Sequence, residues 1–423
     1  MLKLKATFDL RRDVVADILR KETTVGIGET SNGCRAVDTR ILNVERDGGI
    51  LYCWKGASGT TRIGKYDRHT KNNKLLYTFD RQVCVNSCSL NKEETLLAIS
   101  LAQRSGEQDR PKPMSKCLTL LIEIQPINNT KVLKAVDCTV RFLYPETDEN
   151  SLLESHLLLI AEDGYIEQYH ILLSKYEGYR VVMLNPERLS KLAERIAEDV
   201  SWVQWDRHHQ RLYYHTHRDK ILRCFQFYPN RNCEIEKLSL EHHRMEVFTN
   251  SIGSMCVCVS HPVIDGQEQT YSVTFVHSGC SKTFRVSPEE SCLTPLQPLF
   301  IPIGYYILVY VAGCFLHCIN TRHPETLCHS LFLSGLEARL GLPEPSTGVT
   351  VLGVEEKSAG GEGGGASATA LLDLASGKMY SADLSSAFLL HILCSDTPTT
   401  RMRRFRVFPV RLSCTQSPCS EER

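Results

Sequence analysis

The densest group of potential metal ligands lies between residues 314 and 329. It contains three cysteines and three histidines, namely Cys314, His317, Cys318, His323, Cys328 and His329. Thiolate and imidazole groups in tetrahedral array bind structural zinc, but the chain has no Cys-x2-Cys pair, the spacing such sites generally use. On a strand, Cys314 and Cys318 would share one face and His317 the other. We interpret the group as core cysteines with exposed histidines, and zinc binding remains the alternative.

Searches for other reaction chemistry find no matching motif. The chain lacks a Gly-x4-Gly-Lys-Ser/Thr loop, a Gly-x-Ser-x-Gly elbow and a His-Glu-x-x-His pair. Gly26-Ile-Gly28 is followed by Ser31 where a dinucleotide fingerprint needs glycine or alanine. The sequence therefore predicts no catalytic, cofactor-binding or metal-binding residues and no enzyme activity. A metal-dependent propeller enzyme is the less favoured alternative.

Histidines and aromatic residues elsewhere have structural interpretations. Histidines in turn-like segments are expected at the surface: His208, His209, His215, His217, His242 and His243. Four aromatic residues alternate along two neighbouring predicted strands: Trp202, Trp205, Tyr213 and Tyr214. Their pattern favours core positions and cross-strand pairs over a ligand platform.

Short strands separated by turn residues dominate the chain. They form roughly seven groups that recur at about 40–50 residues, the rhythm of four-stranded propeller blades. The first group is predicted at Ile41–Glu45, Gly49–Trp54, Arg62–Asp67 and Lys74–Phe79. The predicted fold class is all-β, a β-propeller-like array of short antiparallel strands with a short N-terminal helix. A pair of β-sandwiches is the competing fold, because strand spacing alone does not exclude it.

Helical patterns are few, at Arg12–Lys21 and Pro186–Glu198. We expect three parts: an N-terminal strand and helix over residues 1–37, a propeller-like domain over residues 38–393, and a disordered basic tail over residues 394–423. Residues 354–369 are rich in glycine and serine, which predicts a flexible loop inside the last strand group.

Membrane and compartment signals are weak. Ile301–Ile319 is long and apolar enough for a membrane span, but its glycines and alternation favour a buried hairpin with strands at Tyr305–Val311 and Cys314–Asn320. The start of the chain has no uninterrupted apolar run, so we expect a cytosolic protein with free thiols. Lys+Arg and Asp+Glu both number 49, which gives no general attraction to nucleic acid.

Several long segments resemble the gamma-secretase-activating protein family. The matching stretches include Leu42–Tyr52, Lys116–Asp137, Arg141–Ile171, Arg195–Asp206 and Thr270–Phe284. Further stretches occur at Leu75–Phe79, Gln210–Tyr214 and His323–Gly335, so that the resemblance covers residues 1 to about 390.

The resemblance implies a non-catalytic regulatory scaffold that corresponds to the N-terminal region of that family. Its implied partners are the gamma-secretase complex and the C-terminal fragment of the amyloid precursor protein. The implied effect is more amyloid-β formation, at the cytoplasmic face of the trans-Golgi network and with at most peripheral membrane association. Family members continue into a helical region beyond the matched part, so this chain is expected to bind partners weakly or incompletely and not to raise amyloid-β output. A generic WD40-like scaffold unrelated to gamma-secretase is the alternative.

Overall fold

The computed structural model describes the strand-forming parts of the chain. The described residues are 2–25, 38–56, 59–103, 116–124, 129–144, 154–174, 180–182, 193–228, 230–237, 244–249, 253–261, 269–286, 298–304, 306–312, 314–321, 330–334, 338, 340–342, 348–355 and 368–384. They fall into two compact units: an N-terminal unit, Asp9–Lys237, and a C-terminal unit that combines Leu238–Arg423 with Met1–Phe8.

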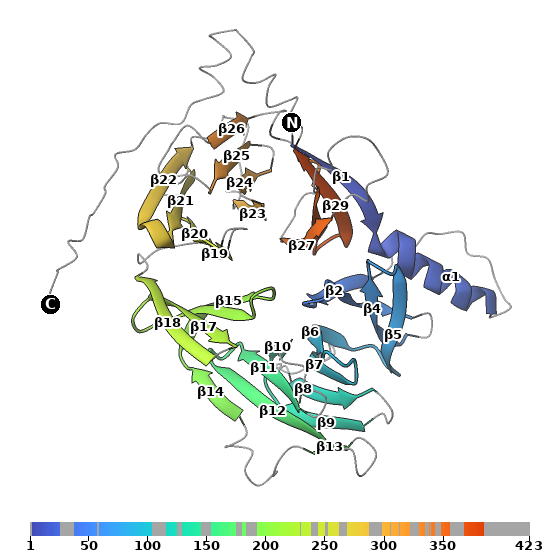
Figure 1. Cartoon of the computed structure of the whole chain (residues 1–423). Helices are drawn as coiled ribbons and strands as arrows, with labels where there is room; N and C mark the ends of the chain where they lie inside the picture. Colours follow the sequence, from blue (N-terminus) through green and yellow to red (C-terminus); the bar gives the residue numbers. More distant parts are fainter. Residues whose placement is uncertain are drawn as a thin grey trace, which may run out of the picture. The chain divides into compact units, whose positions relative to one another are not determined.

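The N-terminal unit contains four small antiparallel sheets, which we call blades 1 to 4 (Figure 1). Blade 1 consists of β2 (Thr39–Val44), β3 (Ile50–Lys55), β4 (Thr61–Asp67) and β5 (Asn72–Phe79), and blade 2 of β6 (Cys84–Leu90), β7 (Leu96–Gln103), β8 (Lys116–Glu123) and β9 (Asn129–Lys134). Blade 3 consists of β10 (Cys138–Leu143), β11 (Glu154–Ala161), β12 (Ile166–Ser174), β13 (Arg180–Val182) and β14 (Ala193–Ala197), and blade 4 of β15 (Val200–Asp206), β16 (Arg211–Thr216), β17 (Ile221–Phe227) and β18 (Asn230–Lys237).

The C-terminal unit contains three further sheets, blades 5 to 7. Blade 5 consists of β19 (Arg244–Thr249), β20 (Met255–Ser260), β21 (Gln269–Phe275) and β22 (Cys280–Val286). Blade 6 consists of β23 (Leu299–Ile303), β24 (Tyr306–Val311), β25 (Phe315–Asn320) and β26 (Ser330–Ser334). Blade 7 consists of β27 (Val349–Glu355), β28 (Ala368–Asp373), β29 (Lys378–Leu384) and the N-terminal strand β1 (Leu2–Asp9), which pairs with β29.

Seven sheets of consecutive antiparallel strands confirm the predicted all-β, propeller-like fold class. Within a unit, a blade that lies between two others has a hydrophobic core on each face. In β7, Leu96 and Ala98 belong to a core shared with blade 3, while Leu97 and Ile99 belong to a core shared with blade 1. Because successive side chains on a strand point to opposite faces, burial on both faces favours a run of consecutive apolar residues such as Leu96–Ile99.

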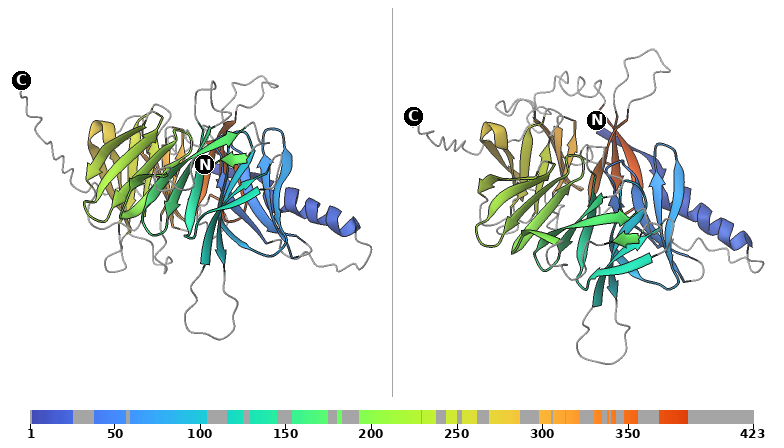
Figure 2. Two further views of the ribbon diagram at one scale, coloured as in Figure 1. Left: turned by 90° about the horizontal axis from the view of Figure 1, so that it is seen from below. Right: turned by 60° about the horizontal axis from the view of Figure 1, so that its bottom comes forward.

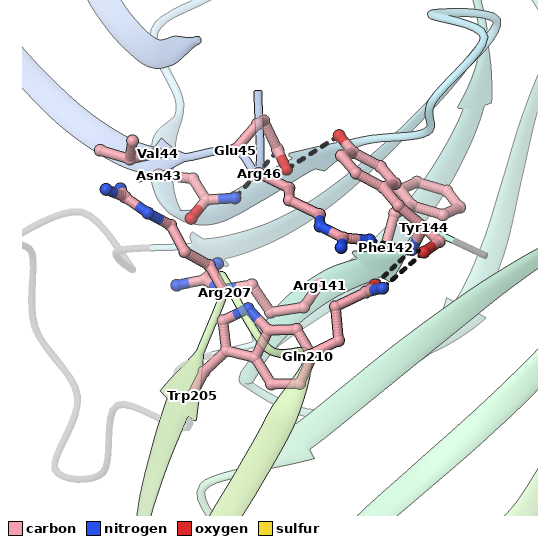
Figure 3. A pocket seen from close by; sticks show the side chains of 10 residues that line it. All are labelled: Asn43, Val44, Glu45, Arg46, Arg141, Phe142, Tyr144, Trp205, Arg207 and Gln210. Atoms are coloured by element: carbon pink, nitrogen blue, oxygen red, sulfur yellow. Dashed lines mark hydrogen bonds between the residues drawn. The ribbon is translucent and has the colours of Figure 1, made fainter. Parts of the chain in front are cut away.

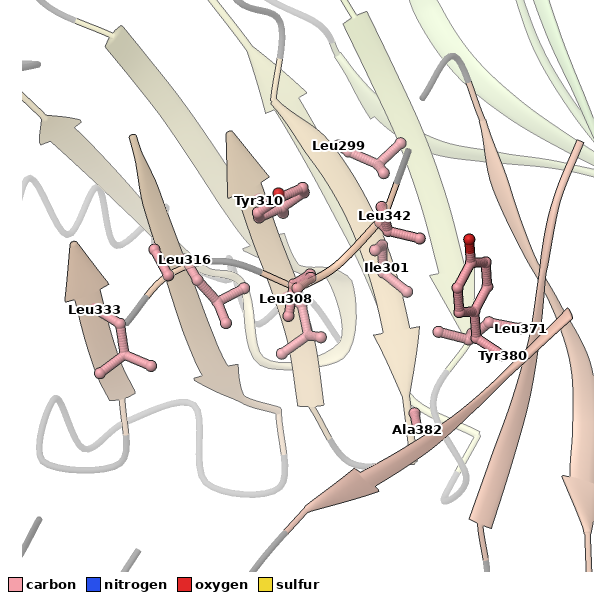
Figure 4. Close-up of a cluster of buried hydrophobic side chains, with 12 residues drawn as sticks. Leu299, Ile301, Leu308, Tyr310, Leu316, Leu333, Leu342, Leu371, Tyr380 and Ala382 are labelled. Atoms are coloured by element: carbon pink, nitrogen blue, oxygen red, sulfur yellow. The ribbon is translucent and has the colours of Figure 1, made fainter. Parts of the chain in front are cut away.

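The core between blades 6 and 7 shows the same packing in the C-terminal unit (Figure 4). Leu308 of β24 and Leu371 of β28 are almost completely buried in it. The segment Ile301–Ile319 therefore supplies strands β23, β24 and β25, with Cys314 donating its backbone N–H to the Val311 carbonyl at the turn. The predicted buried hairpin is confirmed. Among the described residues, no helix is long and apolar enough to span a bilayer.

The N-terminal helix also forms, slightly longer than predicted. A π-helical turn at Arg11–Val15 continues into α1 (Ala16–Val25), which projects away from blade 1 (Figure 2). Val14 and Val15 of the predicted apolar face are buried.

The second predicted helix, Pro186–Glu198, is wrong where the structure describes it. Residues 193–197 form strand β14, which pairs with β12, while residues 186–192 lie outside the described part of the chain. Arg195 donates to the Glu167 carboxylate on β12 at 2.8 Å. The open edge of β12 offers backbone partners and a buried carboxylate, and this tertiary pairing outweighs local helix propensity. Residues 394–423 lie outside the described residues as well.

Candidate functional site

The described residues of the predicted cysteine/histidine group do not gather around one point. Cys314, His317 and Cys318 are described, whereas His323, Cys328 and His329 lie outside the described residues. His317 is 1% exposed and its Nδ1 lies 2.7 Å from the Tyr271 hydroxyl, so its predicted surface position is wrong. Burial lowers the pKa of His317 to about 3, which keeps the imidazole neutral and suited to the space between blades 5 and 6.

The cysteines largely follow the prediction of free thiols. Eleven of the twelve described cysteines are free, and Cys314 departs from the prediction because it is disulfide-bonded. Burial raises the pKa of Cys318 to about 12, so this thiol stays protonated and is a poor metal ligand.

The surface histidines and paired aromatics are also mostly as predicted. His208, His209 and His217 are exposed, and His242 and His243 lie outside the described residues. His215 is the exception, at 6% exposure, because it stacks on Trp202 across the β15–β16 pair. Tyr213 and Tyr214 are buried core residues. Trp205 is partly buried and packs edge-on against Phe227.

A buried polar network joins the four blades of the N-terminal unit, and Figure 3 shows the part that blades 1, 3 and 4 contribute. At its centre is Glu45, which directly follows β2 and is 4% exposed. Its Oε1 accepts hydrogen bonds from the Asn43 amide at 2.9 Å, the Ser89 hydroxyl at 3.1 Å and the Leu90 backbone N–H at 3.0 Å. Its Oε2 accepts one from the Tyr144 hydroxyl at 3.1 Å.

The network continues from blade 3 to blade 4 through Gln210. The Gln210 amide accepts from the Tyr144 backbone N–H and donates to the Tyr144 carbonyl, both at 2.5 Å. Arg46 donates to the same carbonyl at 3.1 Å. Each connecting residue lies at the same end of an inner strand or in the turn after it, so one polar chain links blades 1, 2, 3 and 4.

Electrostatics support a structural role for this network. Burial raises the pKa of Glu45, although the Leu90 N–H, the Arg141 charge and the Tyr144 and Ser89 hydroxyls oppose the rise. Burial and the charge of Arg68 lower the pKa of Arg207 to about 10. Both oxygens of Glu45 already accept hydrogen bonds, which leaves it badly placed for proton transfer with a substrate.

A groove with a volume of about 580 Å³ lies between blades 1 and 2. Its walls come from strands β2, β3, β4, β6, β7 and β8 and from the segment before β6. We define the groove by Asp38, Arg40, Cys53, Trp54, Lys55, Thr61, Arg81, Gln82, Val83, Cys84, Val85, Leu101, Ala102 and Leu118.

The groove combines apolar walls with a few polar groups. Trp54 is 2% exposed and stacks on Tyr52, yet its indole N–H has no hydrogen-bond partner among the described residues. Arg40 and Arg81 are exposed at the groove. Lys55 forms an ion pair with Asp38 at 2.7 Å. Apolar area with a few convergent polar groups is the usual composition of a binding site.

The chain is thus an all-β, propeller-like protein whose described residues form a groove between two blades and a buried polar network. Searched against known family models, the sequence matches none. It is 38% identical to the human (Homo sapiens) gamma-secretase-activating protein, over 93% of this chain and 49% of that protein. To the mouse (Mus musculus) gamma-secretase-activating protein it is 35% identical, over 99% of this chain and 52% of that protein. The chain belongs to the family of gamma-secretase-activating proteins, as the sequence resemblance predicts, and it spans about half the length of these curated relatives.

Solved structures give only distant likenesses. Kuenenia stuttgartiensis hydrazine synthase superimposes with a TM-score of 0.41 at 11% identity, covering 85% of this chain and 99% of that one. Sqt1 of Saccharomyces cerevisiae superimposes with a TM-score of 0.39 at 9% identity, covering 81% and 83%. The family assignment rests on the two curated relatives alone.

Sequence reasoning missed both the groove and the network. Trp54 could have been noticed from the sequence, since it is one of only three tryptophans and follows the apolar run Ile50–Cys53. No sequence pattern marked Glu45 as buried, because a glutamate before Asp47-Gly48-Gly49 is typical of an exposed turn.

Proposed function

We propose that this chain is a non-catalytic protein-binding scaffold that takes part in regulating gamma-secretase, and that an extended segment of a partner docks in the groove. The observation that carries the proposal is the groove itself, in a chain whose relatives are named for activating gamma-secretase.

The chemistry of the groove suits an extended peptide. Arg40 and Arg81 add positive charge that favours a carboxylate on the incoming segment. Val85 and Leu101 give the apolar surface against which side chains of the segment can pack.

The finer parts of the proposal come from the family resemblance. The partners are the gamma-secretase complex and the C-terminal fragment of the amyloid precursor protein, and the process is amyloid-β formation. The place is the cytoplasmic face of the trans-Golgi network. A bound scaffold changes a protease's output only if it favours one enzyme or substrate state over another, so regulation requires contact with at least one of these partners.

Co-precipitation with gamma-secretase tests the proposal. The tagged chain is expressed in cells that lack the full-length relative, membranes are solubilised in mild detergent, and secreted amyloid-β is measured in parallel. We expect the chain to retain gamma-secretase. Failure to retain either the enzyme or the amyloid precursor fragment contradicts the scaffold proposal.

Charge reversal tests the groove separately. Arg81→Glu places a negative charge at the groove, and Arg231→Glu makes the same change at an exposed position on β18 of the same unit. We expect Arg81→Glu to weaken retention about tenfold or more, since one charge-assisted hydrogen bond contributes about 1.5–3 kcal/mol. Arg231→Glu should retain partners like the parent chain. Equal retention by both variants assigns binding to another surface.

A further inference from the structure

Three potential metal ligands meet on blade 3, where His156 pairs with Leu143, the residue that precedes Tyr144 of the polar network. Glu154 and His156 lie two residues apart on β11, so their side chains project from the same face. His170 on β12 is the direct cross-strand partner of His156 in the antiparallel register. The backbone pairing of two neighbouring strands therefore fixes all three positions.

The three side chains converge on one point. The Glu154 Oε1 lies 3.4 Å from the His156 Nε2 and 3.4 Å from the His170 Nδ1. One ligand atom from each residue lies within 4.8 Å of the others. Tetrahedral zinc with bonds of about 2.0–2.1 Å separates neighbouring ligand atoms by about 3.4 Å. The distances match an edge of that tetrahedron, although they are longer than ordinary hydrogen bonds.

The site is open to solvent. All three groups are partly exposed, with side-chain exposures of 17% for His156, 37% for His170 and 44% for Glu154, so an ion can reach them from solvent.

Two neighbouring residues complete the surroundings. The Gln168 amide lies 3.2 Å from the other ring nitrogen of His156, and a half-turn of this amide lets its oxygen accept the Nδ1–H. Metal-binding histidines generally donate their second N–H in this way. Tyr228 packs edge-on against His156, and its hydroxyl is buried without a hydrogen-bond partner among the described residues.

We propose that Glu154, His156 and His170 bind one Zn²⁺ ion, with a water molecule in the fourth position. Two imidazoles and a carboxylate form a known ligand set for zinc with one open position. The ion would tie β11 to β12 in the middle of the N-terminal unit. This site is independent of the proposed gamma-secretase function, and neither result decides the other.

Cobalt titration of the intact chain tests the site. Co²⁺ replaces Zn²⁺ in tetrahedral sites, and its visible spectrum distinguishes nitrogen and oxygen ligands from thiolates. This distinction matters because the chain contains 18 cysteines and 15 histidines, which can bind metal elsewhere. The purified chain is stripped with chelator and titrated with Co²⁺, and the bound ion is then displaced with Zn²⁺.

The variants are Glu154→Gln and His170→Gln, with His209→Gln as the matched control. His209 is an exposed histidine in the same unit that contacts a single carboxylate, Asp206, at 2.8 Å. Loss of one of three ligands should weaken binding by more than about 100-fold, since loss of a supporting residue alone costs about 10–100-fold. Circular dichroism verifies that each variant folds. If His170→Gln does not fold, the test rests on Glu154→Gln, because the Glu154 side chain is half-exposed.

We expect the parent chain and His209→Gln to bind one equivalent of Co²⁺ with a tetrahedral spectrum that lacks thiolate-to-cobalt charge transfer. Glu154→Gln and His170→Gln should lose this equivalent. A parent chain that shows only thiolate-bound cobalt, or variants that keep the nitrogen-and-oxygen spectrum unchanged, would overturn the proposal.

Discussion

Replacing Tyr144 by phenylalanine removes one hydroxyl from the centre of the buried polar network. That hydroxyl lies 3.1 Å from the Glu45 carboxylate and 2.8 Å from the Leu90 carbonyl, and both acceptors are buried. A hydrogen bond to a charged group contributes about 1.5–3 kcal/mol, and a buried acceptor left unsatisfied costs about 1–3 kcal/mol. Because one proton is shared between the two acceptors, we expect a loss of about 2–3 kcal/mol in the free energy of unfolding.

Urea denaturation followed by tryptophan fluorescence measures this loss in the correct unit. All three tryptophans, Trp54, Trp202 and Trp205, lie within Asp9–Lys237. Tyr77→Phe is the matched control, since Tyr77 is partly buried against Phe79 and its hydroxyl has no hydrogen-bond partner among the described residues. The control should change the unfolding free energy by less than about 0.5 kcal/mol.

The pH dependence of the Tyr144→Phe effect gives a second readout. Burial raises the folded-state pKa of Glu45, so the folded state binds a proton more tightly than the unfolded state. Glu45 therefore destabilises the fold above its folded-state pKa, and this penalty disappears as pH falls towards its unfolded value. The lost hydroxyl matters most to the ionised carboxylate, so the effect of Tyr144→Phe should shrink at low pH. A loss below about 0.5 kcal/mol at neutral pH would refute the structural role of the network.

Three further predictions concern single side chains. His317→Gln should flatten the pH dependence of stability between about pH 6.5 and 3, because burial lowers the folded-state pKa of His317 and only the unfolded chain binds the extra proton in this range. Acid titration followed by circular dichroism should show a slope of the unfolding free energy that is lower by up to about 1.4 kcal/mol per pH unit. An unchanged slope contradicts the assignment. Gly164→Ala should destabilise the protein by roughly 1–3 kcal/mol more than Gly59→Ala in urea denaturation. Both glycines have a positive φ, but only at Gly164 would a Cβ lie 2.9 Å from a backbone carbonyl oxygen. Equal losses of stability in the two variants would exclude this clash. Lys134→Met should lower the free energy of unfolding by about 2 kcal/mol, because burial opposes the ionisation of Glu167 while Lys134 and Arg195 lower the pKa of its carboxyl. This stability is present above the unfolded-state pKa of the carboxyl and is lost as pH falls through the folded-state value. A decrease in melting temperature that is the same at pH 7 and at pH 3 would count against this prediction.

The sequence predicts the blade rhythm because most strands are short, apolar and bounded by turns. The hairpin β24–β25 follows from residue alternation and turn position, and it is present within one residue of the predicted bounds. Three inner strands, β10, β19 and β23, have no counterpart among the predicted strands. β10 and β19 have only six residues each and mix charged with apolar side chains, so their strand character depends on pairing with the next strand.

Burial of polar groups was the least predictable property. His317 sits beside cysteines on a short strand, and only the position of Tyr271 on the neighbouring blade explains why it is buried. The hydrogen-bonded residues of the network come from three different blades, namely Glu45, Ser89 and Tyr144. No local sequence pattern predicts that they are in contact. The groove has the same origin, since its walls belong to two blades that the sequence predicts separately.

The pairing of β1 with β29 has a consequence for the timing of folding. Thr7 donates a side-chain hydrogen bond to the Met379 carbonyl at 3.3 Å, across 372 residues of chain. At a synthesis rate of about 5–20 residues per second, the first strand waits roughly 20–75 s on the ribosome for its partner. During that interval both edges of β1 are open to wrong pairing, while blades 1 to 4 can already fold from contiguous sequence. Blade 7 is then the last sheet to assemble, and its completion reports that nearly the whole of this sequence has emerged.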